Sequence, residues 1–276
     1  MDSPDAFDTP RAALSTPLLQ RNRLLGALST EARLRLLPSV DLVQVRTGQS
    51  LDPARGAARR AYFPITAMAS VCQVSPSGES TQVALVGPEG MVGFPLLTGS
   101  EAPWLRSTVQ LPGAVLAVDG ARLAQEFRRG DTTTQVLLGY MHTLMAQMAQ
   151  AALCHRHHSI EQQLARWLLA TADRMAVREI ASTQEMVAGL LGVRREGVTE
   201  AAGRLRDAGL IACRRGHFTL LDTRGLRARA CSCYAVLQSG QDSGAGAGTA
   251  GQPPRTGTST TEQEEQSHPD HVPLAA

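Results

Sequence analysis

The side chains with the clearest chemistry stand in the stretch TQEMVAGLLGVRREGVTEAAGRLRDAGLI, residues 183–211. Here Arg194, Arg195 and Glu196 follow a Gly-Val break, and Thr199 comes about one helical turn later. An arginine can bond O6 and N7 of guanine, and a glutamate can accept a bond from N4 of cytosine. Two arginines at the start of a helix oppose its macrodipole, so a negatively charged partner would stabilise them. A solvated helix face is the competing interpretation, and we favour contact with the major groove of DNA.

The elements that would position these side chains form a helix-turn-helix. This motif needs a small residue where its helices touch, a turn residue that tolerates positive φ, and apolar anchors on the second helix. Thr183 is placed to cap the first helix, which begins at Gln184, and Ala188 is the small contact residue. Gly192 supplies the turn, and Val198 and Ala201 are the apolar anchors of the second helix. A generic helical hairpin would match only part of this pattern.

A basic hairpin is predicted directly after the second helix. Ala208 and Gly209 end the helix, a short strand leads to the turn RRGH, and a second strand FTLL follows. Such a wing offers cations to the DNA backbone, whose contacts position a protein while base contacts specify the sequence. The residues that we expect to contact DNA are Thr183, Gln184, Arg194, Arg195, Glu196, Thr199, Arg204, Arg215 and His217.

The first half of the chain has a different pattern. Short alternating segments separated by Gly and Pro turns predict a small antiparallel barrel or roll between about residues 20 and 128. A long helical stretch follows, in which apolar residues recur at steps of four and three. This seam consists of Leu137, Met141, Leu144 and Met148. From spacing alone, it could join two copies of the chain or pack on the chain's own barrel.

Two groups of metal-ligand residue types remain. Cys154 and His158 stand at i and i+4 within the segment CHRHH, which also contains His155 and His157. The segment CSCY contributes Cys231 and Cys233, which could be half of a metal site or a redox pair. Because the sequence assigns no partner to either group, we expect no metal and no cofactor, and favour hinge packing or phosphate contact for CHRHH. A metal enzyme built on these histidines is the competing class, but no nucleophile–base set or phosphate loop supports an enzyme.

Composition limits the alternatives. All 27 basic residues are arginine, net charge is +2, and residues 238–276 contain one arginine against five acidic residues. The five cysteines form no disulfide framework, which favours a reducing cytoplasm. The sequence shows neither a secretory signal nor an apolar run that could cross a membrane.

The order of barrel, long helix and winged helix resembles the CRP/FNR family of bacterial transcription regulators. The likeness covers about residues 20–237, with its most distinctive stretches in YFP, VALVGPEGMVGF, HRHHSIEQQLARWLL and GVRREGVTEAAGRLRDAGLIACRRGHFTLLD. The resemblance implies a homodimer joined along the long helix, so it favours the dimer interpretation of the seam. The family's recognition Arg-Glu pair falls on Arg195 and Glu196. Glu200 stands where the best-known members have a second arginine, so their target sequence cannot be transferred.

The effector site departs from the family pattern. Members that bind cyclic nucleotides have a Gly-Glu-Leu corner, which here reads Gly90, Met91, Val92, and a later Arg pair, which here reads Glu101-Ala102. Arg106 lies nearby, but methionine cannot replace the ribose-binding glutamate, so we do not expect cyclic AMP. No cysteine precedes Cys72, unlike the iron–sulfur branch of the family. The effector stays unknown, with haem still open.

The sequence thus predicts an α+β chain with an N-terminal antiparallel β-roll, a long dimerisation helix and a C-terminal winged helix-turn-helix. We expect disorder over 1–18, the sensor roll over 19–128, the dimerisation helix and hinge over 129–157, the DNA-binding domain over 158–237, and a disordered tail over 238–276. The expected function is a cytoplasmic homodimeric regulator that reads a near-palindromic operator in double-stranded DNA through residues 194–208, with RNA polymerase as an open further partner. The alternative is a small-molecule-sensing module whose winged helix contacts protein.

Overall fold

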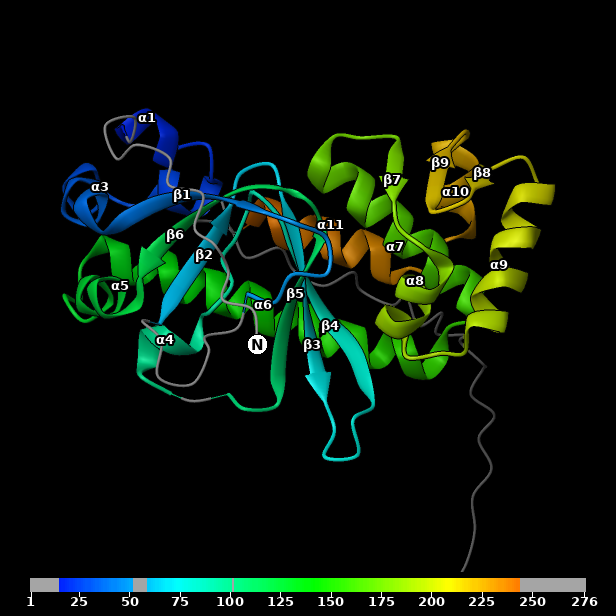
Figure 1. The fold of residues 1–276 in the computed structure, drawn as a ribbon, viewed down its shortest axis with the longest axis horizontal. Coiled ribbons are helices and arrows are strands. Elements are labelled where there is room, and N and C mark those ends of the chain that lie inside the picture. The colour runs from blue at the N-terminus through cyan, green and yellow to red at the C-terminus, as the bar shows by residue number, and fades with distance from the viewer. Residues whose placement is uncertain (1–14, 52–58, 101, 244–276) are drawn as a thin grey trace, which may run out of the picture.

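The computed structural model describes residues 15–51, 59–100 and 102–243 of the 276-residue chain. In Figure 1, antiparallel strands and short helices lie on one side, and a smaller helical unit with its own sheet lies on the other. A long helix, α6 (Thr132–His157), connects the two. The expected α+β architecture of roll, long helix and helix-turn-helix is confirmed.

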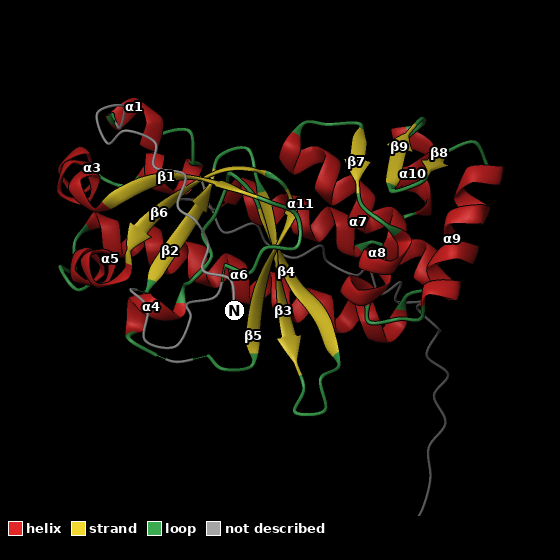
Figure 2. Ribbon diagram, viewed as in Figure 1, coloured by secondary structure: helices red, strands yellow, loops and turns green. Residues whose placement is uncertain are grey.

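Two three-stranded antiparallel sheets build the β-roll (Figure 2), with strand orders β1-β6-β2 and β4-β3-β5. The strands are β1 (Val40–Val45), β2 (Arg60–Pro64), β3 (Met68–Val74), β4 (Ser80–Val86), β5 (Leu105–Leu111) and β6 (Gly113–Asp119). Two helices accompany them, α4 (Pro95–Thr98) and α5 (Gly120–Phe127). Phe63, Val109 and Leu116 are fully buried in the core that these strands share.

Within the described residues, three short helices precede the first strand. They are α1 (Thr16–Leu19), α2 (Arg23–Ala27) and α3 (Thr30–Leu36), and a 3₁₀ turn over Leu37–Ser39 follows them. The expectation of strands from about residue 20 is therefore wrong for residues 23–36. The physical reason is capping: Asn22 and Ser29 each accept a backbone N–H at the start of a helix.

The long helix α6 carries apolar side chains both toward the β-roll and on its exposed surface. Leu137 and Leu144 are buried in the core of the β-roll, and Met141 and Met148 pack partly buried against the same core. Leu137 and Leu144 thus face the chain's own barrel, whereas Met141 and Met148 keep part of their surface exposed, and the assignment of the four residues to a dimer interface stays a prediction. Other apolar side chains of α6 are exposed: Leu138, Met145 and Leu153. A helix with apolar residues all round offers two seams of the same spacing, so the sequence could not choose between them.

The C-terminal unit is a winged helix. Its elements are α7 (Ile160–Met175), β7 (Glu179–Ala181), α8 (Gln184–Leu191), α9 (Arg195–Asp207), β8 (Ile211–Arg214), β9 (His217–Leu220), α10 (Thr223–Arg229) and α11 (Cys233–Ser243). The three strands pair in the order β7-β9-β8. Trp167 of α7 and Phe218 of β9 are among the largest fully buried side chains and lie in the core of this unit.

Each range predicted to be disordered overlaps a described helix. Helix α1 begins at Thr16, inside the range 1–18, and α11 continues to Ser243, past the predicted start of the tail at 238. The remaining parts of the two predictions, residues 1–14 and 244–276, lie outside the described residues. Among the described helices, none is both long and apolar enough to cross a membrane.

Candidate nucleic-acid interface

The turn between α8 and α9 has the geometry that the sequence predicted. Thr183 caps α8, because its side-chain oxygen accepts the backbone N–H of Met186 at 3.1 Å. Gly192 ends the helix with φ of 66°, a left-handed conformation that favours glycine. Ala188 is buried where the two helices meet. The short connection therefore holds α9 directly against α8.

Helix α9 buries one face and exposes the other. Val198, Ala201 and Leu205 are each 0% exposed and anchor the helix in the core. The side chains on the opposite face at its first turns are all exposed: Arg194, Arg195, Glu196 and Thr199. Arg194 is the N-cap residue but makes no side-chain cap. The amino end of α9 is thus open to solvent rather than covered by the β-roll, although Gly192 behind it lies against Thr81 of β4.

Contacts around the first turn of α9 pre-position two of the predicted reading residues. The hydroxyl of Thr199 donates to Oε1 of Gln184 at 2.7 Å, which joins the first turns of α8 and α9. Arg195 Nε lies 4.0 Å from Glu185 Oε2, and both side chains are mostly exposed. An exposed pair at this distance contributes little energy, about 0–1 kcal/mol. Arg195 can therefore exchange this partner for a base edge or a phosphate.

The predicted wing is present as the antiparallel hairpin β8-β9. Its tip turns at Gly216, which has φ of 77°, and exposes Arg214 and Arg215. His217 Nδ1 lies 3.2 Å from Glu179 Oε1 on the neighbouring strand β7. The hairpin therefore exposes its cations beside α9.

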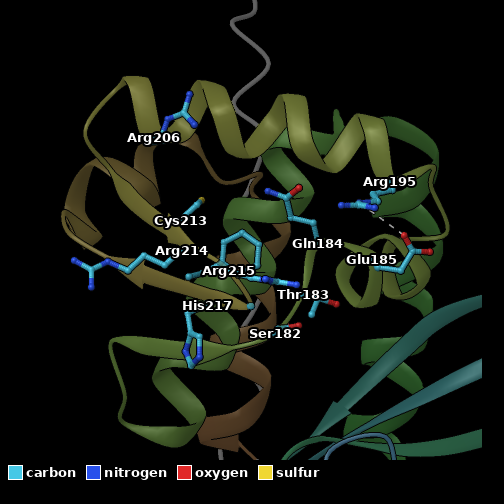
Figure 3. Close-up of a pocket in the computed structure, with 12 residues that line it drawn as sticks. Ser182, Thr183, Gln184, Glu185, Arg195, Arg206, Cys213, Arg214, Arg215 and His217 are labelled. Atoms are coloured by element: carbon cyan, nitrogen blue, oxygen red, sulfur yellow. Dashed lines mark ion pairs between the residues drawn. The ribbon is translucent and has the colours of Figure 1, made fainter.

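A concavity of about 530 Å³ lies between the wing and the two helices. Figure 3 shows α9 along one side of it, with Arg195 and Arg206 toward opposite ends of the helix, and the wing on the other. Among the predicted DNA contacts, Thr183, Gln184, Arg195, Arg215 and His217 line it. The structure thus brings together residues that are up to 34 positions apart in the sequence.

Arg204 lies apart from this group. Its guanidinium bonds Glu161 of α7 at 2.7 Å and Glu200 at 3.1 Å, and these acidic partners raise its pKa. Arg229 also pairs with Glu161, at 3.0 Å. Arg204 is therefore engaged in a network that holds α9 on α7, and it does not line the concavity.

The predicted effector corner, Gly90 to Val92, is filled by the chain's own side chains. Met91 is fully buried, and its carbonyl accepts a bond from the hydroxyl of Tyr140 at 2.6 Å. A Cβ at Gly90 would meet the same tyrosine ring at 2.6 Å, so the long helix occupies this corner. Val92 is buried in a bridge to Tyr62, whereas Arg106 is exposed and donates to nearby carbonyls. Glu101 lies outside the described residues.

Beside this corner, a buried ion pair joins the two units. Nε of Arg174, on α7, donates to Oε1 of Glu89 in the β-roll at 2.9 Å. The side chains are 2% and 12% exposed, and Oε1 also accepts the backbone N–H of Gly87 at 3.1 Å. Sequence reasoning missed both residues, because they are 85 positions apart and belong to different domains.

Four residues of the two leftover groups come together at the hinge after α6. Cys154 and His158 meet Cys231 and Cys233, with ligand atoms all within 4.8 Å of one another. The pKa of Cys154 is lowered, chiefly because it accepts a hydrogen bond from Cys231, whose own pKa is raised by the same bond and by burial. The expectation that neither CHRHH nor CSCY has partner ligands is wrong, because the two segments supply ligand atoms that lie next to each other.

The other two histidines of CHRHH stay outside this cluster. His155 faces the β-roll, with its Nδ1 3.3 Å from Oγ1 of Thr81, and burial lowers its pKa. His157 is exposed on the last turn of α6.

Comparison with known proteins identifies the architecture. Residues 162–229 match the family model of the Crp-like helix-turn-helix domain. A putative CRP/FNR-family transcriptional regulator from Eubacterium rectale is similar in structure, with a TM-score of 0.61 and 15% identity over 76% of this chain and 98% of that one. The chain has the CRP/FNR fold. FixK2 from Bradyrhizobium japonicum has a TM-score of 0.59 and 16% identity, over 70% and 98% of the two chains. The CRP-family regulator TTHB099 from Thermus thermophilus has a TM-score of 0.55 and 21% identity, over 68% and 95%.

The match to the CRP/FNR fold spans the roll, the long helix and the winged helix, since it covers nearly all of each similar structure. Two of these similar structures, those from Eubacterium rectale and Thermus thermophilus, are described as transcriptional regulators. No curated protein sequence matches the chain.

Proposed function

We propose that this protein is a sequence-specific DNA-binding transcription regulator that acts as a homodimer on a near-palindromic operator. The single observation that carries the proposal is the exposed amino end of α9 beside a basic wing, with Arg195 of the helix and Arg215 of the wing lining one concavity. This end of a recognition helix is the part that enters a major groove in helix-turn-helix proteins.

Two kinds of contact divide the interface. Arg194, Arg195, Glu196 and Thr199 contact base edges, because they lie exposed on the first turns of α9. Arg215 on the wing contacts the sugar–phosphate backbone and positions the domain. His217 and the α8 residues Thr183 and Gln184 assist at the same surface. The cap of Thr183 and the hydrogen bond that Gln184 accepts from Thr199 hold these groups in place before DNA arrives.

The dimer forms through the outward face of α6 rather than through the buried seam. Leu138, Met145 and Leu153 on this face are 43%, 67% and 50% exposed. Ala149 and Ala152, also exposed, lie between the larger side chains and leave room for close approach of a second helix. An apolar helix face is stable in water when it packs against another apolar face. Pairing along α6 would place two winged helices on one operator with two-fold symmetry.

Selection from randomised duplex oligonucleotides tests the proposal. The full chain should enrich a two-fold symmetric site, and Arg195→Ala should lose discrimination at one base pair per half-site. The expected cost is about 1–3 kcal/mol, or roughly 5- to 150-fold in relative affinity. Arg122→Ala, which removes an exposed arginine from α5, is the matched control and should select the same site as the wild type.

The wing gives a second, distinguishable readout. Arg215→Ala should weaken binding to all sequences about equally and reduce the slope of affinity against salt by about one ion. Enrichment of no sequence by the wild-type chain would contradict the proposal and favour the alternative, in which the winged helix contacts protein. An unchanged site preference of Arg195→Ala would contradict the role of α9 alone.

A further inference from the structure

A cluster of four soft ligands lies where α6 ends and α11 begins. Cys154 lies in the last turn of α6, and His158 is the C-cap residue of the same helix. Cys233 is the first residue of α11, and Cys231 lies two residues before it. Cys154 Sγ lies 3.5 Å from Cys231 Sγ, and Cys233 Sγ lies 3.5 Å from His158 Nδ1. Three thiols and one imidazole in mutual contact are a donor set that suits zinc.

The distances fit a single ion better than the competing arrangements. Zinc–sulfur bonds of about 2.3 Å and zinc–nitrogen bonds of about 2.0 Å in a tetrahedron put neighbouring ligand atoms roughly 3.5–3.8 Å apart. The two 3.5 Å contacts are close to these edges. A disulfide needs sulfurs at about 2.05 Å, and all five cysteines are free. An iron–sulfur cluster spreads its ligands over several irons, whereas here all four ligand atoms lie within 4.8 Å.

Burial and charge also suit a bound cation. The three cysteines are 4% exposed or less and form a cluster of their own, apart from the two hydrophobic cores. Three thiolates, a neutral imidazole and Zn²⁺ sum to one negative charge. Arg166 supplies the opposite charge: its guanidinium acts electrostatically on Cys154, and its Nε is buried without a hydrogen-bond partner in the described part of the chain.

A neighbouring amide supports the ligands from outside. Nε2 of Gln150 donates to Sγ of Cys233 at 2.8 Å, one turn before Cys154 on α6. Such outer hydrogen bonds orient metal ligands and stabilise the thiolate form. The backbone carbonyl of His158 accepts a hydrogen bond from Nε2 of Gln163 at 2.8 Å, and this bond fixes the position of His158 at the hinge.

We propose that Cys154, His158, Cys231 and Cys233 bind one structural Zn²⁺ ion that fastens α11 to the hinge between α6 and α7. Because the chain supplies all four ligands, no coordination position is left for substrate, and the site is structural rather than catalytic. Zinc binding would hold the last described helix against the junction of the long helix and the winged helix. All four ligands lie outside the residues that match the helix-turn-helix family model, since that match covers 162–229.

Metal analysis of the full chain, purified without chelator or metal-affinity resin, tests the proposal. We expect one zinc per chain in the wild type and loss of at least 90% of it in Cys231→Ser. Cys72→Ser, which changes a partly buried cysteine of the β-roll, is the matched control and should keep its zinc. His158→Cys, which restores a four-ligand set, should keep zinc, whereas His158→Ala should lower its affinity by at least tenfold.

Two further measurements separate zinc from the alternatives. Cobalt exchanged into the wild-type site should give the visible bands of a tetrahedral ion and the ultraviolet bands of cobalt–thiolate bonds. Thiol titration of the native protein should show two reactive cysteines, Cys72 and Cys213, and all five after chelation. Iron with acid-labile sulfide would overturn the proposal in favour of a cluster. Metal-free protein with a Cys154–Cys231 disulfide, or with all thiols reactive, would overturn it outright.

Discussion

Replacement of Arg174 by Ala should strongly destabilise the protein, because it leaves Glu89 as a buried charge. The guanidinium is 2% exposed and the carboxylate 12%. Removing one partner of a buried ion pair costs about 3–5 kcal/mol. Glu89 would retain the backbone N–H of Gly87 and a contact of 3.7 Å to Arg23, whose side chain is 56% exposed. The exposed contact with Arg23 offsets at most about 1 kcal/mol of this cost. We therefore expect Arg174→Ala to lower the free energy of unfolding by about 3 kcal/mol.

Equilibrium unfolding in urea, followed by tryptophan fluorescence, measures this loss. Trp167 is buried in the winged helix and Trp104 is half-exposed in the β-roll, so both units contribute signal. Arg60→Ala is the matched control, because Arg60 pairs with Asp41 but both side chains are more than a third exposed. The control should lose less than about 1 kcal/mol.

A double variant distinguishes the charge from the packing of Arg174. Arg174→Met combined with Glu89→Gln removes both charges and should be more stable than Arg174→Ala alone, since replacing a buried pair as a whole is often neutral. A loss below about 1 kcal/mol in Arg174→Ala, or a double variant no more stable than the single one, would refute the reasoning.

Three other predictions concern the dimer, the turn and acid stability. Met145→Glu should halve the molar mass seen by light scattering without lowering monomer stability, because the side chain is 67% exposed. Gly192→Ala should cost about 1–2 kcal/mol at its φ of 66°, whereas Gly189→Ala, with open space around its Cβ, should stabilise α8. Arg35 lowers the pKa of Glu126 below 4.5 by a hydrogen bond, so this carboxylate stabilises the fold above that pH and less as pH falls. Glu126→Gln should therefore make the melting temperature fall less steeply as pH is lowered, in thermal unfolding measured at pH 3–7.

The helix-turn-helix could be predicted from the sequence because its signals are local. The cap at Thr183, the left-handed Gly192 and the anchor Val198 lie within 16 residues, and each acts on its immediate neighbours. The wing turn at Gly216 follows in the same way. Local backbone requirements of this kind survive in the folded protein, so α8 begins at Gln184 as predicted, and α9 lies one residue inside the predicted range 194–208 at each end.

Features set by tertiary packing could not be predicted. The spacing of Leu137 and Leu144 fits a seam, but spacing does not say which partner covers it, and the β-roll does. Cys154 and Cys231 are 77 positions apart, and only the fold shows that they touch. The Glu89–Arg174 pair joins two domains for the same reason. Long-range contacts require the relative placement of elements, which no single segment encodes.

The two-faced helix α6 has a consequence for genetics. Substitutions toward the roll, as at Leu144, would lower the amount of folded protein in a cell, and all of its activities would decline together. Substitutions on the exposed surface of α6, as at Leu138, would leave each copy folded and, in the proposed dimer, abolish only what two copies do jointly. A saturation screen along this one helix would therefore sort alleles into two phenotypes that alternate with the helical repeat.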